Sequence, residues 1–417
     1  MSSFQDFLIL VSILVEAGLL CWLEKKAWNT LVTPLFILML PYVAVLLISV
    51  AISGYFGFID FYYPSILIWN AGLLLFAIPS FAFSFLCRRN NYQTVSSGIR
   101  NDDMPRIFTL IGLFLVMVFL YRILQTVRSS HFILGSDEFA EEFAGYGFWG
   151  HLKRFGSVML SIYIYYLDRN RRWLWLFIIV LLSVMVINMV KGTMIIPCVV
   201  GVFMRIVSGK TKISGSLLLS VAISAVAVFF VTLVLTIVVV NENDLDDKAL
   251  LFIFQHFVHY LTSGTLGLSM DMELGFPDRG DIDVIFTQFI NIYNQISGDK
   301  TILSPVNPVY HFTGTNLTNV RTVFGTLYIY TNHLQFSVYI LCLSSICYFF
   351  KIVSDASRNL YVNSIYFYLC SLLAMGWFEF YFFHLDLVEI PVILLLLYCF
   401  DWAFVGRKYK YPIICST

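Results

Sequence analysis

Long runs of apolar residues, separated by short polar segments, recur along most of this chain. A bilayer core about 30 Å thick is crossed by about 20 helical residues, so runs of this length predict membrane-spanning helices. The pattern predicts an all-α polytopic membrane protein with about eleven transmembrane helices. The expected spans are 4–23, 31–52, 64–87, 107–125, 155–168, 173–190, 193–207, 214–240, 332–350, 361–383 and 388–405.

Composition supports this class. Hydrophobic residues make up 59% of the 417 residues and charged residues only 12%, whereas soluble domains have roughly 45–50% and about 25%. An ordinary soluble enzyme is therefore excluded. The formal net charge is zero, so no basic field attracts nucleic acid, and no nucleic-acid partner is expected.

The distribution of charge predicts the orientation of the spans. Alternate connections hold seventeen of the 26 Lys and Arg residues, and basic residues favour the cytoplasmic side of a membrane. The other connections hold most of the acidic residues. The N-terminus is therefore expected outside and the C-terminus inside, in a single integral membrane domain covering 1–417.

Two long connections lie on the predicted outer side, 126–154 and 241–331. The second is longer than most connectors, and such loops usually carry function or are disordered. Apolar side chains recur at helical spacing in it, which predicts amphipathic helices over 247–263, ending at Gly264, and over about 283–296. The outer side is therefore where chemistry is expected.

The polar stretch from Leu303 to Val320 follows these helices and is rich in Asn, Thr and Tyr, including Tyr310 and Asn319. Amides and hydroxyls can hydrogen bond neutral sugar hydroxyls, and a tyrosine can face a sugar ring. A solvated connector has the same makeup, and both interpretations stay open. We expect Tyr310, Asn319 and, on the helix over 247–263, His259 to bind substrate.

Several basic residues lie at the outer boundary, against the charge rule, where they could bind an anion such as a lipid-linked diphosphate. The alternative is local ion pairing or contact with lipid headgroups. These residues are Arg122, Arg128, Lys153, Arg154, Lys191, Arg279 and Arg321.

Histidines supply the candidate bases. His256 and His259 are three residues apart, but no carboxylate completes a metal site nearby in the sequence, so hydrogen bonding is the favoured interpretation and no metal is expected. His311 lies in the polar stretch and His333 follows it, and a neutral imidazole can accept a proton from a sugar hydroxyl. The chain has no P-loop, dinucleotide fingerprint or nucleotide-sugar motif, so no cofactor is expected.

Three short patches carry a family resemblance: Tyr260 to Gly264, Lys191-Gly192-Thr193, and Asn319 to Thr322 continuing through Phe324, Gly325 and Tyr328. These patches resemble segments of the Wzy-type O-antigen polymerases, which join oligosaccharide repeat units. The layout of about eleven spans and a large late outer loop is also similar. The chain departs from the family pattern at Tyr330 to Leu334, where an Asp-x-Gly would be expected.

The resemblance implies a GT-C-like glycosyltransferase of the bacterial inner membrane, working at the periplasmic face without metal or nucleotide. Its substrates would be undecaprenyl-pyrophosphate-linked oligosaccharides, and its protein partner a chain-length regulator. We expect Arg321 and Arg279 to stabilise the departing diphosphate and His311 to act as base, with Arg154 and Lys191 binding substrate. An O-antigen ligase, a lipid-linked oligosaccharide flippase and a regulatory membrane protein remain alternatives.

Overall fold

The computed structural model describes residues 3–89, 104–129, 139, 142–143, 147–187, 191–212, 214, 230, 247–276, 281–304, 307–357 and 359–405. The described chain is mainly helical, and its strands form one two-stranded sheet. It divides into two compact units, one of residues 1–93, 254–352 and 372–387, the other of 94–253, 353–371 and 388–417. We call them unit 1 and unit 2.

Five helices in the described part of the chain are long and apolar enough to cross a membrane. They cover Phe4–Trp28, Pro34–Ile52, Tyr63–Arg88, Arg106–Ser129 and His333–Ala356. Shorter apolar helices cover Leu174–Ile187, Met194–Val207 and Leu360–Ala374. The predicted all-α membrane class is therefore confirmed, while the predicted span 214–240 lies outside the described residues except at Ser214 and Phe230.

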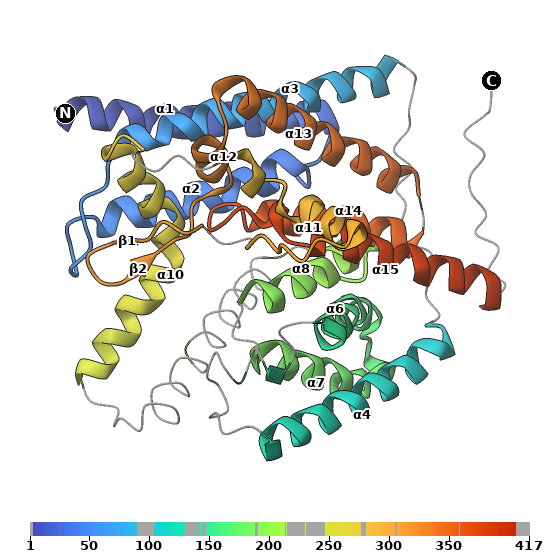
Figure 1. Ribbon diagram of the computed structural model, residues 1–417. Helices are drawn as coiled ribbons and strands as arrows, with labels where there is room; N and C mark the ends of the chain where they lie inside the picture. Colours follow the sequence, from blue (N-terminus) through green and yellow to red (C-terminus); the bar gives the residue numbers. More distant parts are fainter. Residues whose placement is uncertain are drawn as a thin grey trace. The chain divides into compact units, whose positions relative to one another are not determined.

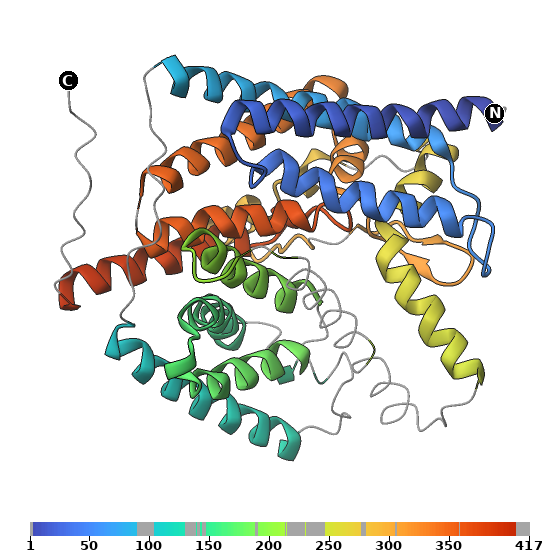
Figure 2. The same cartoon turned by 180° about the vertical axis from the view of Figure 1, so that it is seen from behind.

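Unit 1 is built on α1 (Ser3–Trp28), α2 (Pro34–Ile52) and α3 (Ile66–Arg89), which pack on one another. Figures 1 and 2 show α1 and α3 side by side. The first helix exposes Phe4, Phe7 and Trp22 although it is apolar along most of its length. Apolar residues on both the packed and the exposed face are typical of a membrane helix.

The shorter elements of unit 1 between 281 and 331 are η4 (Ile282–Val284), α11 (Thr287–Ser297), β1 (His311–Phe312), β2 (Leu317–Thr318) and α12 (Val323–Tyr330). A buried tryptophan ties α12 to the membrane helices. The indole Nε1 of Trp69 on α3 donates to Thr322 Oγ1 over 2.9 Å, and the ring packs edge-on against Phe324. Thr322 is also the N-cap of α12, because its hydroxyl accepts from the Gly325 N–H.

Helix α10 (Asp247–Glu273) begins where the sequence predicts but does not stop at Gly264. A Cβ at Gly264 would lie 2.3 Å from the carbonyl oxygen of Phe378, and one at Gly267 would lie 2.6 Å from that of Val320. These glycines permit close backbone approach inside a continuous helix, so the predicted end at Gly264 is wrong. The helix carries two further turns, and Asp271 lies on them.

The predicted span 361–383 also differs. Helix α14 (Leu360–Ala374) ends early, and a turn and the short η5 (Tyr381–Phe383) lead to α15 (Asp386–Phe400) and a final π-helical turn, η6 (Asp401–Val405). Neighbouring elements supply hydrogen bonds to this irregular backbone. The Gly376 carbonyl accepts from Val323 N–H, and the Phe382 carbonyl accepts from the Gln288 side chain. Satisfied backbone groups allow a helix to break at this depth.

Unit 2 contains α4 (Arg106–Ser129), α6 (Gly147–Tyr166), α7 (Leu174–Ile187) and α8 (Lys191–Val207), with the short η2 (Arg169–Arg171) between α6 and α7. Helix α6 packs against α4, α7 and α8. Helix α13 (His333–Ala356) belongs mainly to unit 1, and most of α14 and α15 belongs to unit 2.

Candidate functional site

The polar centre of unit 1 is a buried cluster of one carboxylate, one guanidinium and one imidazole. We call Asp271, His311 and Arg321 the Asp271 cluster. Asp271 comes from the last turns of α10, His311 from β1, and Arg321 from the residues just before α12. The cluster thus joins three elements of the large loop that are up to 50 positions apart in sequence.

Arg321 is engaged on several sides. Its Nε and Nη2 both donate to the Asp271 carboxylate, the latter over 3.2 Å, and its Nη1 donates to the Val320 carbonyl over 3.1 Å. The residue is only 1% exposed. A two-point guanidinium–carboxylate contact of this kind is strong and directional. These contacts give Arg321 a positioning role towards Asp271, and its action on a diphosphate stays a prediction.

The imidazole of His311 uses the same carboxylate. Its Nε2 lies 2.5 Å from Asp271 Oδ1, and the side chain keeps 10% of its surface exposed. Asp271 accepts the Nε2 proton, which assigns the lone pair to Nδ1. Among the described residues, His311 Nδ1 has no hydrogen-bond partner. An imidazole oriented by a carboxylate, with its second nitrogen available, is an arrangement suited to accepting a proton.

The neighbouring polar residues hold the loop that carries His311. Asn307 accepts from the Tyr330 hydroxyl over 2.7 Å and from the Val309 N–H over 3.0 Å, and its carbonyl accepts from Asn319 Nδ2 over 3.2 Å. Burial raises the pKa of Tyr330 to about 12, so its hydroxyl stays protonated and continues to donate. Asn319, predicted to bind substrate, is thus bonded within the loop.

The β1–β2 hairpin holds His311 from the other side. Its register pairs His311 with Thr318. His259 Nδ1 lies 3.0 Å from Thr313 Oγ1, and this hydroxyl donates to the Asn316 carbonyl. His259 is buried, as the preferred hydrogen-bonding interpretation requires, and its contact fixes the hairpin. Tyr310, directly before the strand, is 57% exposed and is open to a ligand.

The predicted cations have different surroundings. Arg122, on α4, donates to the Phe143 carbonyl over 3.1 Å and packs its guanidinium over Trp149, so it fastens Phe143 and α6 to α4. Arg279 lies outside the described residues. Lys191 begins α8, but its side chain is not described.

Arg154 belongs to a second cluster, in unit 2, of the same three chemical types. Its Nη1 lies 3.1 Å from Glu389 Oε2, and His151 Nδ1 lies 2.8 Å from Glu389 Oε1. We call His151, Arg154 and Glu389 the Glu389 cluster. Their side chains are 57%, 25% and 16% exposed, respectively. Solvent and solutes therefore reach this cluster far more easily than the Asp271 cluster.

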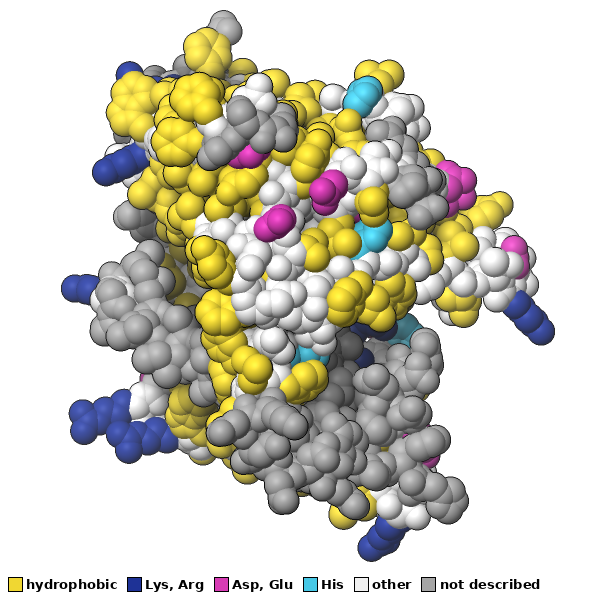
Figure 3. All heavy atoms as spheres, turned by 90° about the vertical axis from the view of Figure 1, so that its left-hand side faces the viewer, with side chains coloured by type: hydrophobic (Ala, Val, Ile, Leu, Met, Phe, Trp, Pro, Cys, Tyr) yellow, Lys and Arg dark blue, Asp and Glu magenta, His cyan; other side chains and the backbone are white. Residues whose placement is uncertain are grey.

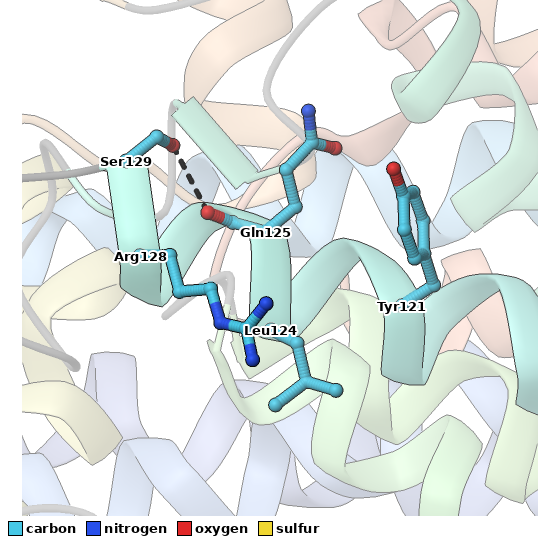
Figure 4. Close-up of a pocket in the computed structure, with 5 residues that line it drawn as sticks. All are labelled: Tyr121, Leu124, Gln125, Arg128 and Ser129. Carbon is cyan, nitrogen blue, oxygen red and sulfur yellow. Dashed lines mark hydrogen bonds between the residues drawn. The ribbon is translucent and has the colours of Figure 1, made fainter.

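A shallow hollow of about 310 Å³ lies on α4, lined by Tyr121, Leu124, Gln125, Arg128 and Ser129 (Figure 4). All five residues come from one helix, and the Ser129 hydroxyl points back to the Gln125 carbonyl at 3.0 Å. In the part of the chain that the structure describes, no second element lines this hollow. The face drawn in Figure 3, by contrast, has Asp, Glu and His side chains among hydrophobic ones.

Sequence reasoning found His311 and Arg321 but missed Asp271, which holds them together. A signal for Asp271 was present. Ser263, Gly267 and Asp271 are small or polar and recur every four residues, which continues one helical face past the glycine read as a stop.

These observations define the class: an all-α membrane protein in which a long loop is anchored by a buried carboxylate–guanidinium–imidazole cluster. The chain belongs to a protein family described as a family of unknown function (DUF6337), which matches residues 57–405. No curated protein and no solved structure matches the chain.

Proposed function

We propose that this protein is a glycosyltransferase that polymerises lipid-linked oligosaccharide repeat units, with His311 as the general base. The observation that carries the proposal is the Asp271 cluster, in which a carboxylate orients the imidazole and leaves Nδ1 available. The resemblance to Wzy-type polymerases and the polar stretch around Tyr310 support a sugar substrate.

In the proposed reaction, a hydroxyl of the incoming repeat unit attacks the anomeric carbon of the growing glycan. The new C–O bond forms as the bond between the anomeric carbon and the diphosphate oxygen breaks, and that electron pair leaves with undecaprenyl pyrophosphate. His311 Nδ1 accepts the hydroxyl proton, and Asp271 stabilises the resulting imidazolium. Arg321 keeps Asp271 in place.

Other cations would bind the departing diphosphate, since developing negative charge is stabilised by fixed positive groups. Arg279, Arg154 and Lys191 remain the proposed candidates. Tyr310 would contact a sugar ring, while His259 and Asn319 would shape the sugar site through the loop that they fasten.

The proposed protein is a single GT-C-like membrane domain of eleven spans in the bacterial inner membrane. Its N-terminus lies outside, and the loops 126–154 and 241–331 lie in the periplasm. It needs no metal or nucleotide, and its protein partner is a chain-length regulator.

The test is deletion of the gene in its host, followed by gel separation of the surface polysaccharide. Polymerisation predicts collapse of the ladder to a single repeat unit on the core. Loss of every band above the core would favour the ligase or the flippase, and an unchanged ladder would overturn the proposal.

Complementation then tests the base. His311→Gln should fail to restore the ladder at normal protein level, because glutamine amide nitrogen cannot accept the proton. His333→Gln is the matched control: His333 is exposed at the start of α13 and should be dispensable. A full ladder with His311→Gln would remove His311 from the mechanism.

A further inference from the structure

Helix α11 buries polar side chains and exposes apolar ones, which is the reverse of a helix that faces water. Thr287 and Gln288 on its polar arc are each 1% exposed. Further along this arc, Asn291 exchanges two hydrogen bonds with the backbone of Leu303, over 2.9 and 2.8 Å, and Asn294 donates to the Thr301 carbonyl over 2.9 Å. The polar side chains of α11 are thus largely used within the protein.

The opposite side of the helix is apolar and uncovered. Phe286, Phe289, Tyr293 and Ile296 are 37%, 49%, 69% and 81% exposed. Their spacing of three, four and three residues puts them in one stripe along the helix. We call this the α11 stripe. It carries no charged residue.

The stripe is continuous with the exposed apolar surface of a membrane-spanning helix. Phe286 packs against Tyr339 of α13, with ring centroids 6.0 Å apart. Tyr339 is six residues inside α13, which corresponds to roughly 9 Å along the helix axis from His333. Leu334 and Val338, on the same part of α13, are 73% and 50% exposed. The α11 stripe therefore begins beside the second turn of α13, inside the N-terminal end of this membrane-spanning helix.

We propose that α11 is an interfacial membrane helix whose stripe lies against the lipid acyl chains beside the N-terminal end of α13. An uncharged apolar stripe gains free energy in contact with hydrocarbon, and the polar side chains Gln288, Asn291 and Asn294 already have partners within the protein. Contact between the stripe and lipid would keep the start of the polar stretch that follows α11 close to the membrane. The inference concerns where α11 lies and does not depend on the proposed reaction.

Site-specific photocrosslinking tests the proposal on the full chain. Benzoylphenylalanine replaces Tyr293 or Ile296, one position per variant, and each protein is reconstituted in phosphatidylethanolamine/phosphatidylglycerol vesicles containing radiolabelled phospholipid. Gln295→benzoylphenylalanine is the matched control, because Gln295 is exposed on the same helix but on its polar arc. Val338→benzoylphenylalanine, on α13, shows that lipid labelling works.

Lipid adducts at positions 293 and 296, well above those at 295 and comparable to those at 338, are the expected result. Labelling at 338 with no more adduct at 293 and 296 than at 295 would overturn the proposal. Crosslinks from 293 or 296 to a second copy of the chain would also overturn it, since the stripe would then be a protein interface.

Discussion

The two units use the same three side-chain types in opposite surroundings. In the Asp271 cluster the guanidinium is almost fully buried and no side chain is more than 10% exposed, whereas the side chains of the Glu389 cluster are 16–57% exposed. A buried ion pair has lost its water and depends on its partners, while an exposed pair is screened and its loss is partly made up by solvent. Similar contacts should therefore have very different energetic consequences.

The largest difference between the two clusters is expected when the arginine of each is replaced by alanine. Arg321→Ala leaves the Asp271 charge buried without its partner, which should lower the free energy of unfolding by about 3–5 kcal/mol. Arg154→Ala should lower it by less, about 1 kcal/mol, because the Glu389 side chain is 16% exposed and keeps its contact with His151. Denaturant titration of the full chain in detergent micelles measures both. Equal losses would show that burial does not separate the two clusters.

How far the sequence predicts these clusters depends on the range of the interactions. Helix α2 and its N-cap at Thr33 follow from local signals, and the predicted span 31–52 is close to Pro34–Ile52. The pairing of Asp271 with Arg321 depends instead on tertiary contacts across 50 residues. A carboxylate beyond an expected helix end gave no local sign of its partner.

The end of helix α14 at Ala374 also depends on tertiary contacts. Residues 361–383 form one apolar run in the sequence, which local reasoning extends as a single helix. Hydrogen bonds from Val323 and Gln288 stabilise the irregular backbone at Gly376 and Phe382, and these donors come from distant segments. Composition predicts that a segment is apolar, but tertiary hydrogen bonds decide where its helix ends.

The next effect tests the packing behind the Asp271 cluster. A Cβ at Gly267 would lie 2.6 Å from the Val320 carbonyl oxygen and 3.1 Å from Arg321 Nη1. Gly267→Ala should therefore push the arginine from its partner and cost about 1–3 kcal/mol in unfolding free energy. Gly18→Ala on α1 meets no atom within 4 Å and should be neutral or stabilising by up to about 1 kcal/mol. A neutral Gly267→Ala would contradict the close packing of α10 on this cluster.

A smaller loss is expected from the hydrogen bond that steadies the His311 loop. Tyr330→Phe removes the donor to Asn307 Oδ1, which keeps its bond from the Val309 N–H. The expected loss of unfolding free energy is about 1 kcal/mol, the usual net value of one such bond. Tyr293→Phe, which removes an exposed hydroxyl, is the control in the same denaturation experiment. Equal stability of the two variants would remove Tyr330 from the support of the loop.

The smallest effect concerns the charge of the Glu389 cluster and sharpens the comparison through salt. Glu389→Gln keeps a group that can hydrogen bond His151 but loses the attraction to Arg154, so the expected cost is below about 1 kcal/mol. The Debye length falls from about 10 Å at 0.1 M to about 3 Å at 1 M salt, so this cost should shrink further as salt is added. Asp271→Asn should show a larger loss that is insensitive to salt, because the ion pair that it breaks is shielded from solvent ions. Denaturant titration of both variants at low and high salt measures these losses of unfolding free energy. A large, salt-independent loss for Glu389→Gln would mean that the two clusters have the same electrostatic environment.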